Sequence, residues 1–433
     1  MGGRTPLLVL TFSLAVLSIK LGISHGCRET ERKALIDFKR GLHDPSNRLS
    51  SWVGEDCCAW EGVGCSNISG HVIKLDLRNS RRCKWALRGD ITPSLPSLQQ
   101  LNRLDLSGNY FMHKPIPKFL GAFRRLTYLN LSGAGFMGRV PAQLGNLSTL
   151  QHLDLSWVSF TNAANWLQDL NALPHVQEIE LISCDLGTFP RSLSHVNFTS
   201  LTTYLDLSYN SLHGSLPASL GNLSMLRSLD LGSKLKYLYL SNNSFSGNLS
   251  PRITNTMPSL QWFDLSMNNM SGEIPFSYCQ LRNLEGLQLY ENNLSRVIPN
   301  CWKTSSNLLL LDLSSNKLVG GVPDSLCNLQ MLESLHLSHN NLSGQIPHCL
   351  KSCTELATLD LGHNNFIGNI PTWIGESLLY LKTLSLRSNA FTGSIPQLSS
   401  LPSLRILDLS NNNLSGTIPQ SFGDFNALKS APT

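Results

Sequence analysis

Aspartates recur at one fixed place along this 433-residue chain. Each lies at the centre of an LDL segment, and the series is Asp105, Asp154, Asp206, Asp230, Asp312, Asp360 and Asp408. Neighbouring carboxylates could serve acid–base chemistry. Their regular recurrence favours a structural role instead, in which a consensus residue organises hydrogen bonds along the outer face of a sheet. Because a motif without geometry is weak evidence for a site, the structural role is our prediction.

Three histidines, His336, His339 and His363, fall within two successive repeats. Imidazole suits metal binding or pH sensing, but no cysteine or carboxylate completes a metal set, so we expect neither a metal nor a cofactor. The chain also lacks GxSxG, HExxH, a glycine-rich phosphate loop and a kinase signature. These absences disfavour an enzyme and leave no catalytic residue to name.

The eleven cysteines fit an oxidising compartment. Two adjacent cysteines do not easily pair with each other, so in the first cluster we predict Cys27–Cys57 and Cys58–Cys65, although spacing alone does not fix this connectivity. Cysteines that recur at matching offsets in neighbouring repeats predict two further pairs, Cys279–Cys301 and Cys327–Cys349. The odd total leaves at least one thiol unpaired, with Cys83 and Cys353 as candidates, and Cys184 is expected in the core.

The elements that must position these residues repeat about every 24 residues. Fifteen LxL cores begin at Leu75, Leu104, Leu129, Leu153, Ile179, Leu205, Leu229, Leu238, Phe263, Leu287, Leu311, Leu335, Leu359, Leu384 and Leu407. A fixed period with leucine at fixed offsets marks a leucine-rich-repeat solenoid. We therefore predict an α/β solenoid, a right-handed horseshoe or superhelix with a parallel β-sheet on its concave side. The following LxGxIP segments predict irregular or short 3₁₀ structure behind that sheet.

The fifth residue after the strand start is asparagine in ten repeats: Asn109, Asn210, Asn243, Asn268, Asn292, Asn316, Asn340, Asn364, Asn389 and Asn412. A buried amide must be satisfied, so we predict a ladder in which each asparagine bonds backbone in its own and the next coil. Ser80, Ala134, Val158 and Lys234 replace it elsewhere, which predicts less regular early coils.

The period fails once, between Leu229 and Leu238, which lie nine residues apart. Nine extended residues reach only ~30 Å, too little to form a strand, cross the convex side and return. We infer a deleted segment and predict a local defect in the solenoid.

Export is indicated by the first 26 residues, in which Arg4 precedes the apolar run Leu7–Ile19. We expect a signal peptide over 1–26, a cap over 27–72, repeats over 73–427 and an unfinished end over 428–433. No second apolar stretch follows, so the chain as written is expected to lack a membrane anchor. Eleven sequons occur, and one of them, Asn130, lies in a predicted strand. The other ten predict glycans at Asn67, Asn146, Asn197, Asn222, Asn242, Asn248, Asn269, Asn293, Asn341 and Asn413.

The cap reads CRETERKALIDFKRGLHDPSNRLSSWVGEDCCAWEGVGCSNISGHV over Cys27–Val72. Its apolar helix face, paired tryptophans and cysteines, followed by LxGxIP repeats, resemble plant leucine-rich-repeat receptor-like proteins, in particular those named for fungal xylanase perception and Cladosporium resistance. The resemblance implies an ectodomain at the plasma membrane that binds a microbial or endogenous protein or peptide and recruits a receptor-kinase co-receptor. The chain stops where such proteins continue, so we expect either a truncated receptor or a secreted fragment. The alternative is a secreted inhibitor of a microbial wall-degrading enzyme, similar to polygalacturonase-inhibiting proteins.

Side chains that the repeat does not require mark where a partner would bind. The concave candidates for ligand binding are Trp157, Tyr209, Tyr237, Tyr239, Trp262, Tyr290, His336 and Arg387, with Tyr204, Glu178 and Glu180 beside them. Clustered exposed aromatics are typical of recognition surfaces, although some of them, Tyr204 above all, could pack inward. A net charge of +5 without a basic stripe argues against nucleic acid as a partner.

Overall fold

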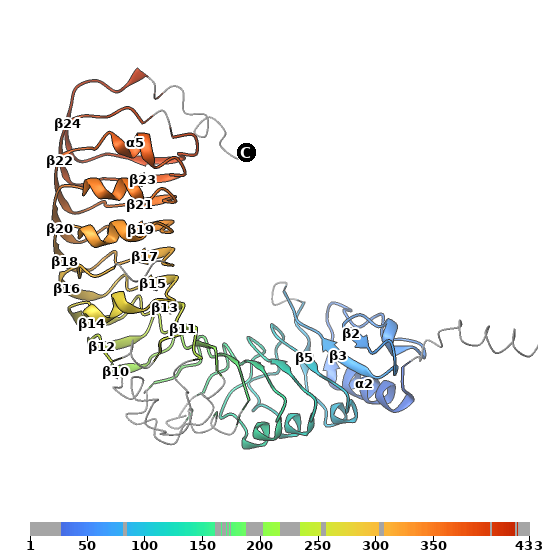
Figure 1. Ribbon diagram of the computed structural model, residues 1–433. Coiled ribbons are helices and arrows are strands. Elements are labelled where there is room, and N and C mark those ends of the chain that lie inside the picture. The colour runs from blue at the N-terminus through green and yellow to red at the C-terminus, as the bar shows by residue number, and fades with distance from the viewer. Residues whose placement is uncertain are drawn as a thin grey trace, which may run out of the picture.

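The computed structural model describes residues 27–80, 85–160, 175–187, 202–216, 234–252, 257–302, 307–398 and 401–420, with residues 166, 170, 173 and 422. The predicted signal peptide, Cys83, Leu229, Asn197 and Asn222 lie outside these ranges. Stacked coils form a curved solenoid, with the cap at the blue end and the last repeats at the red end (Figure 1). In the ranges covered, no helix combines the length and the apolar character needed to span a bilayer.

The inner side of the curve carries a 15-stranded sheet. Its strands are β2 (Val63–Cys65), β3 (Val72–Asp76), β5 (Arg103–Asp105), β6 (Tyr128–Asn130), β7 (His152–Asp154), β8 (Glu178–Glu180), β9 (Tyr204–Asp206), β11 (Tyr237–Tyr239), β13 (Trp262–Asp264), β15 (Gly286–Gln288), β17 (Leu310–Asp312), β19 (Ser334–His336), β21 (Thr358–Asp360), β23 (Thr383–Ser385) and β25 (Ile406–Asp408). Only β2 is antiparallel to its neighbour, β3. Central residues such as Leu311 and Leu335 are fully buried, because strand side chains alternate between faces.

The repeat interruption is visible in this sheet. Strand β9 pairs directly with β11, and Leu205 faces Leu238 in register. No rung therefore stands between these two strands, which agrees with the predicted defect. The sheet holds fourteen of the fifteen expected strands, and its remaining member is β2 from the cap.

Behind the first sheet lies a second one that the sequence analysis did not predict. It has nine parallel strands: β10 (His213–Ser215), β12 (Ser244–Asn248), β14 (Asn269–Gly272), β16 (Asn293–Val297), β18 (Lys317–Gly320), β20 (Asn341–Gly344), β22 (Asn365–Asn369), β24 (Ala390–Ser394) and β26 (Asn413–Ser415). They follow the outer side of the bend (Figure 1). In β20, Leu342 is buried between exposed Asn341 and Ser343, so the NLSG segment alternates like a strand. The expectation of purely irregular or 3₁₀ structure was wrong here.

Short helices complete many of the coils behind the sheets. They are η3 (Leu95–Ser97), η4 (Lys118–Ala122), η5 (Ala142–Asn146), η8 (Phe276–Gln280), η9 (Asp324–Asn328), η10 (His348–Ser352) and α5 (Trp373–Ser377). Proline directly precedes five of them, for example Pro323 before η9. The 3₁₀ expectation is therefore confirmed for this part of the coil.

The asparagine ladder is present, with one correction. The Asn340 Nδ2 donates to the Leu337 oxygen of its own coil at 3.2 Å and to the Leu313 oxygen of the preceding coil at 2.9 Å. Its Oδ1 accepts from the backbone N–H of Leu318, also in the preceding coil, at 2.9 Å. The neighbour bonded is thus the preceding coil and not the next one. The amide of Asn340 thus has a partner for both its nitrogen and its oxygen.

The cap closes the first coil with an amphipathic helix. Helix α2 (Glu29–Gly41) buries Leu35 and Phe38, while Trp52 and Trp60 stack at 5.4 Å between ring centroids. Strand β1 (Leu42–His43) pairs with β4 (Arg88–Gly89), and η1 (Cys57–Ala59) follows the tryptophan loop. The cap is therefore packed directly on the repeats.

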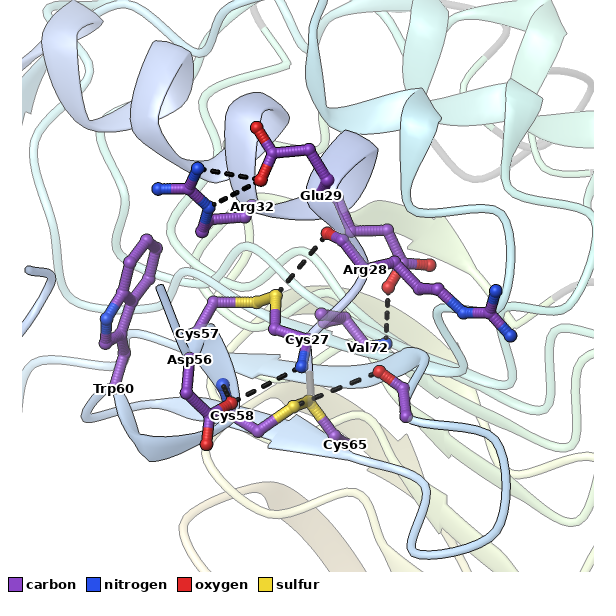
Figure 2. Close-up of a disulfide and its surroundings, with 12 residues drawn as sticks. Cys27, Arg28, Glu29, Arg32, Asp56, Cys57, Cys58, Trp60, Cys65 and Val72 are labelled. Carbon is purple, nitrogen blue, oxygen red and sulfur yellow. Dashed lines mark hydrogen bonds and ion pairs between the residues drawn. A yellow bond between two sulfur atoms is a disulfide. The ribbon is translucent and has the colours of Figure 1, made fainter. Parts of the chain in front are cut away.

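Eight of the described cysteines form four disulfides, in the pairings predicted. Cys27–Cys57 and Cys58–Cys65 lie side by side in the cap (Figure 2). The other two, Cys279–Cys301 and Cys327–Cys349, join neighbouring coils with Cα–Cα distances of 5.6 and 5.5 Å. Cys184 and Cys353 are buried and unpaired, as expected of a core thiol and a leftover thiol.

Candidate functional site

The concave face consists of the outward side chains of the strands from β3 to β25. Strand neighbours are in register, so equivalent residues stand side by side about 4.8 Å apart. Two columns result, one on each side of the buried central residue. Any cluster on this face is therefore built from residues about one repeat apart in sequence.

Four aromatic side chains meet in the middle of the concave face. Tyr204, Tyr237 and Trp262 occupy one column on successive strands, and Tyr239 stands in the other. The Tyr204 ring lies 6.0 Å from that of Tyr237 and 5.4 Å from that of Tyr239. All four are half-buried. Tyr204 alternates with buried Leu205, so the alternative that it packs inward is wrong. These four residues are called the aromatic cluster below.

Trp262 is held in place by its neighbours on β15. Its Nε1 donates to Oε1 of Gln288 at 3.0 Å. A Cβ added to Gly286 would lie 2.5 Å from the indole carbons, so the ring rests over a position where no side chain stands. Nothing in the repeat pattern marks Gly286, so its role was not predicted from the sequence.

The remaining aromatic candidates are not part of this cluster. Trp157 and Tyr209 lie in the turns after β7 and β9 with φ of 66° and 57°, and they are 64% and 55% exposed. Left-handed backbone recurs at this turn position in most repeats and carries the side chain away from the strand columns. Tyr290 is half-buried in the turn after β15. The strands therefore gather four of the aromatic residues named from the sequence, and the other three lie in the turns that follow the strands.

The polar candidates occupy the other half of the face. His336 stands between Asp312 and Asp360 in register, and Arg387 pairs with Asp408 at 3.6 Å. His339 and His363 stack at 4.0 Å between ring centroids. Burial, helped by His339 and Arg387, lowers the pKa of His363. Strands β15 and β17 separate this group from the aromatic cluster.

Potential metal ligands come together at one place among the residues that the structure covers, at Cys27, Cys57 and Cys58. All three sulfurs are already in disulfides.

The recurrent aspartates have the structural role predicted, within their own repeat. The Oδ1 of Asp206 accepts from the backbone N–H of Ser208 at 2.9 Å, and Asp154 does the same with Ser156. The bond closes the turn that follows the strand and does not run along the sheet, which corrects the expectation of hydrogen bonds between coils. It uses Oδ1 of the carboxylate in both residues.

Carboxylates gather beside the aromatic cluster. Glu180 stands between Asp154 and Asp206 in register. Burial, with the charges of Asp154, Asp206 and Glu178, raises the pKa of Glu180 to about 7. Asp154, Glu178, Glu180 and Asp206 are called the carboxylate cluster below.

A stacked row leads into this cluster from the cap side. Arg103 lies over the Tyr128 ring at 3.5 Å, Tyr128 stacks on His152 at 4.3 Å, and His152 Nδ1 lies 2.7 Å from a Glu178 oxygen. The face thus changes from basic to acidic to aromatic along successive strands.

The sequons lie mostly away from the concave face. Asn67, Asn146, Asn248, Asn269, Asn341 and Asn413 are exposed, while Asn242 and Asn293 are half-buried. Four of them begin second-sheet strands: Asn269, Asn293, Asn341 and Asn413. Asn130 instead faces the concave side, where its Oδ1 accepts from Ser132. Glycans at the exposed sites would leave the aromatic cluster open, and their occupancy stays a prediction.

Fold and site together define a capped leucine-rich-repeat solenoid whose concave face carries an aromatic and a carboxylate cluster. The Leucine rich repeat N-terminal domain model matches residues 28–66. Leucine-rich-repeat models match 202–223, 234–256, 259–281, 307–329, 330–375 and 381–423. The cap match agrees with the helix and disulfides of the structure.

Similarity to individual proteins shows which leucine-rich-repeat proteins this chain resembles. Receptor-like protein EIX1 of Solanum lycopersicum is 33% identical over 54% of this chain, and receptor-like protein EIX2 is 32% identical over 66%. The chain belongs to the leucine-rich-repeat receptor-like proteins of plants. It spans 29% and 36% of the length of these two relatives.

Solved structures give the same fold. The ectodomain of the Arabidopsis thaliana receptor kinase GASSHO1/SCHENGEN3, in complex with CASPARIAN STRIP INTEGRITY FACTOR 2, is 29% identical with a TM-score of 0.65. The alignment covers 92% of this chain and 52% of that one. The plant peptide hormone receptor RGFR1 in complex with RGF2 is 26% identical with a TM-score of 0.62, over 79% of this chain and 60% of that one.

Proposed function

We propose that the chain is the ligand-binding part of a plant cell-surface receptor-like protein, which recognises a protein or peptide on its concave face and acts with a receptor-kinase co-receptor. The aromatic cluster is the observation that carries this proposal. Aromatic side chains with one face open are typical anchors of protein interfaces. These four have no place in the core, which the central leucines fill.

The relatives and neighbours support the same class of function. The relatives above are receptor-like proteins, which favours a receptor over the inhibitor alternative. Both structural neighbours have a partner bound. The peptide hormone receptor RGFR1 is in complex with RGF2, and GASSHO1/SCHENGEN3 is in complex with CASPARIAN STRIP INTEGRITY FACTOR 2. Recognition without catalysis, and a location on the outer face of the plasma membrane, follow from membership of this family as proposals.

A selection from a random linear peptide library tests the proposal with the secreted chain as bait. We expect peptides to be enriched by the natural protein and lost when Trp262→Ala and Tyr239→Ala are combined. Tyr380→Ala is the matched control, because Tyr380 is 59% exposed and lies outside both sheets. The proposal is wrong if the double variant enriches the same peptides as the natural chain.

A further inference from the structure

The recurrent aspartate of the LDL segment has two different electrostatic environments on the concave face. At the cap end, Asp76 pairs with Lys74 and Arg78, and Asp105 pairs with Arg103 at 3.4 Å. Burial alone would raise the pKa of Asp76, but hydrogen bonds from Arg78 and Lys74 outweigh it and hold that pKa at about 2. Cations on neighbouring positions thus neutralise this end of the column.

On strands β7 to β9 the column has no such partners. Asp154 and Asp206 are 7% and 8% exposed, and each accepts a turn-closing hydrogen bond from the serine two residues on. Within the described residues, no lysine or arginine forms an ion pair with them or with Glu180, and His152, on the same strand as Asp154, is engaged by Glu178 at 2.7 Å. Desolvated carboxylates without a counter-ion are costly, and a bound cation would remove that cost.

Aromatic rings stand on the other side of the same carboxylates. Tyr204 shares β9 with Asp206, and Tyr239 faces Asp206 across the register of β9 and β11. The two tyrosine rings lie 5.4 Å apart and half-open to the concave side. Ring faces beside carboxylates favour a guanidinium or ammonium group, which gains cation–π attraction as well as charge pairing.

We propose that strands β7 to β11 bind a basic side chain, arginine or lysine, of an extended peptide that lies along the concave face, with Asp154, Glu180 and Asp206 as its charge partners and Tyr204 and Tyr239 as its aromatic wall. This assignment rests on the proposed function and adds the chemistry of the ligand. Charge complementarity is the reason for this choice of ligand. The concave face is open, acidic and aromatic at these strands, and it therefore suits a basic peptide.

Glu180 makes this binding depend on pH. The groups that face it are His152 and Asp154 on β7, Glu178 on its own strand, and Tyr204 and Asp206 on β9. With a pKa of about 7, Glu180 is protonated in acid and ionised above neutrality. A cation prefers the ionised form, so affinity rises between about pH 5.5 and about pH 8.

The test uses arginine-containing peptides enriched by the secreted chain and their glutamine-substituted copies, with affinity measured by calorimetry. We expect an excess of lysine and arginine in the enriched pool, and a loss of about tenfold or more for Glu180→Gln and for Asp206→Asn. Asp312→Asn is the matched control, because Asp312 makes the same turn bond to Ser314 at 3.0 Å far from the cluster. An unchanged melting temperature verifies that each variant is folded.

Three results would overturn the assignment: no basic residue in excess in the pool, equal affinity of Glu180→Gln and the natural chain for the arginine peptides, or saturation of the cluster by calcium ions alone with no peptide preference. If peptides still depend on Trp262 and Tyr239 in any of these cases, the proposed function stands and only the ligand chemistry fails.

Discussion

Trp262 rests over Gly286 on the next strand, so closely that a Cβ at position 286 would lie 2.5 Å from the indole. Gly286 pairs with Trp262 in register, and a larger residue would lift the ring off the sheet. One missing side chain thus fixes the orientation of an aromatic residue that the repeat itself does not require.

Gly286→Ala is therefore expected to displace Trp262 and to weaken peptide binding, at a stability cost of about 1–3 kcal/mol from overpacking. Gly321→Ala is the control, because the nearest atom to its Cβ would be the Ser343 oxygen at an ordinary 3.6 Å. Tryptophan fluorescence and peptide affinity check this. Equal affinity of the two variants would show that the stacking has no role in binding.

Asn340→Ala is expected to lower the free energy of unfolding by about 1–3 kcal/mol, because it orphans the Leu318 N–H and removes one of the two hydrogen bonds to the Leu313 carbonyl of the preceding coil, which keeps the bond from Asn316. Lys317→Ala is the control, because Lys317 is exposed and directly precedes Leu318 in β18, and it should change the free energy of unfolding little. Denaturant unfolding of the secreted chain gives both values. A loss for Asn340→Ala no greater than that for Lys317→Ala would contradict the tie between coils.

Glu31 ties helix α2 to the start of strand β3 and should be needed for stability. Glu31 is only 3% exposed. Its carboxylate accepts a hydrogen bond from the Val72 N–H at 2.9 Å and lies 2.9 Å from Nδ1 of His71. We expect Glu31→Ala to cost about 2–3 kcal/mol. Glu29→Ala, on the same helix, removes only exposed ion pairs with Arg32 and Lys33 and should leave stability nearly unchanged. Thermal unfolding compares them, and the reverse order would refute this role.

Thiol titration tests the disulfide assignment. The native chain should show Cys184 and Cys353 as unreactive, because burial raises their pKa values to about 12 and about 11. After unfolding without reductant, at most three of the eleven cysteines should react, since eight are in disulfides. Four or more reactive thiols would mean that at least one pairing is wrong.

Glu180 also affects stability as a function of pH. Its folded pKa, about 7, lies above its ordinary value of 4.5, so the fold favours the protonated form and loses stability as the pH rises between these values. Allowing for solvent screening of a half-buried group, the loss is roughly 1–2 kcal/mol. Glu180→Gln should flatten this part of the stability profile. A profile identical to that of the natural chain would contradict the shift.

The scaffold could be predicted because its signals are local or strictly periodic. Central leucines such as Leu311, the ladder residue Asn340 and the pair Cys327–Cys349 follow from offsets within a repeat. The second sheet was missed because Asn341–Gly344 is a short segment in which one buried leucine is too little to show alternation. The direction of the ladder bonds depends on the rise between coils, which spacing does not contain.

The candidate site was only partly predictable, for a geometric reason. Trp157 and Tyr209 differ from Tyr204 by a few residues, yet a left-handed turn separates them from the strand columns. Gly286 matters through a side chain one coil away, and the carboxylate cluster depends on which coils lack a lysine or arginine. Such properties arise from register between strands, not from the composition of any one repeat.

Photo-crosslinking of an enriched peptide to the secreted chain tests the central claim most directly. A photoreactive group at the centre of the peptide should label concave residues of strands β9 to β13, within Tyr204–Asp206, Tyr237–Tyr239 and Trp262–Asp264. Labelling confined to second-sheet strands, such as Ser244–Asn248 and Asn269–Gly272, would contradict recognition on the concave face.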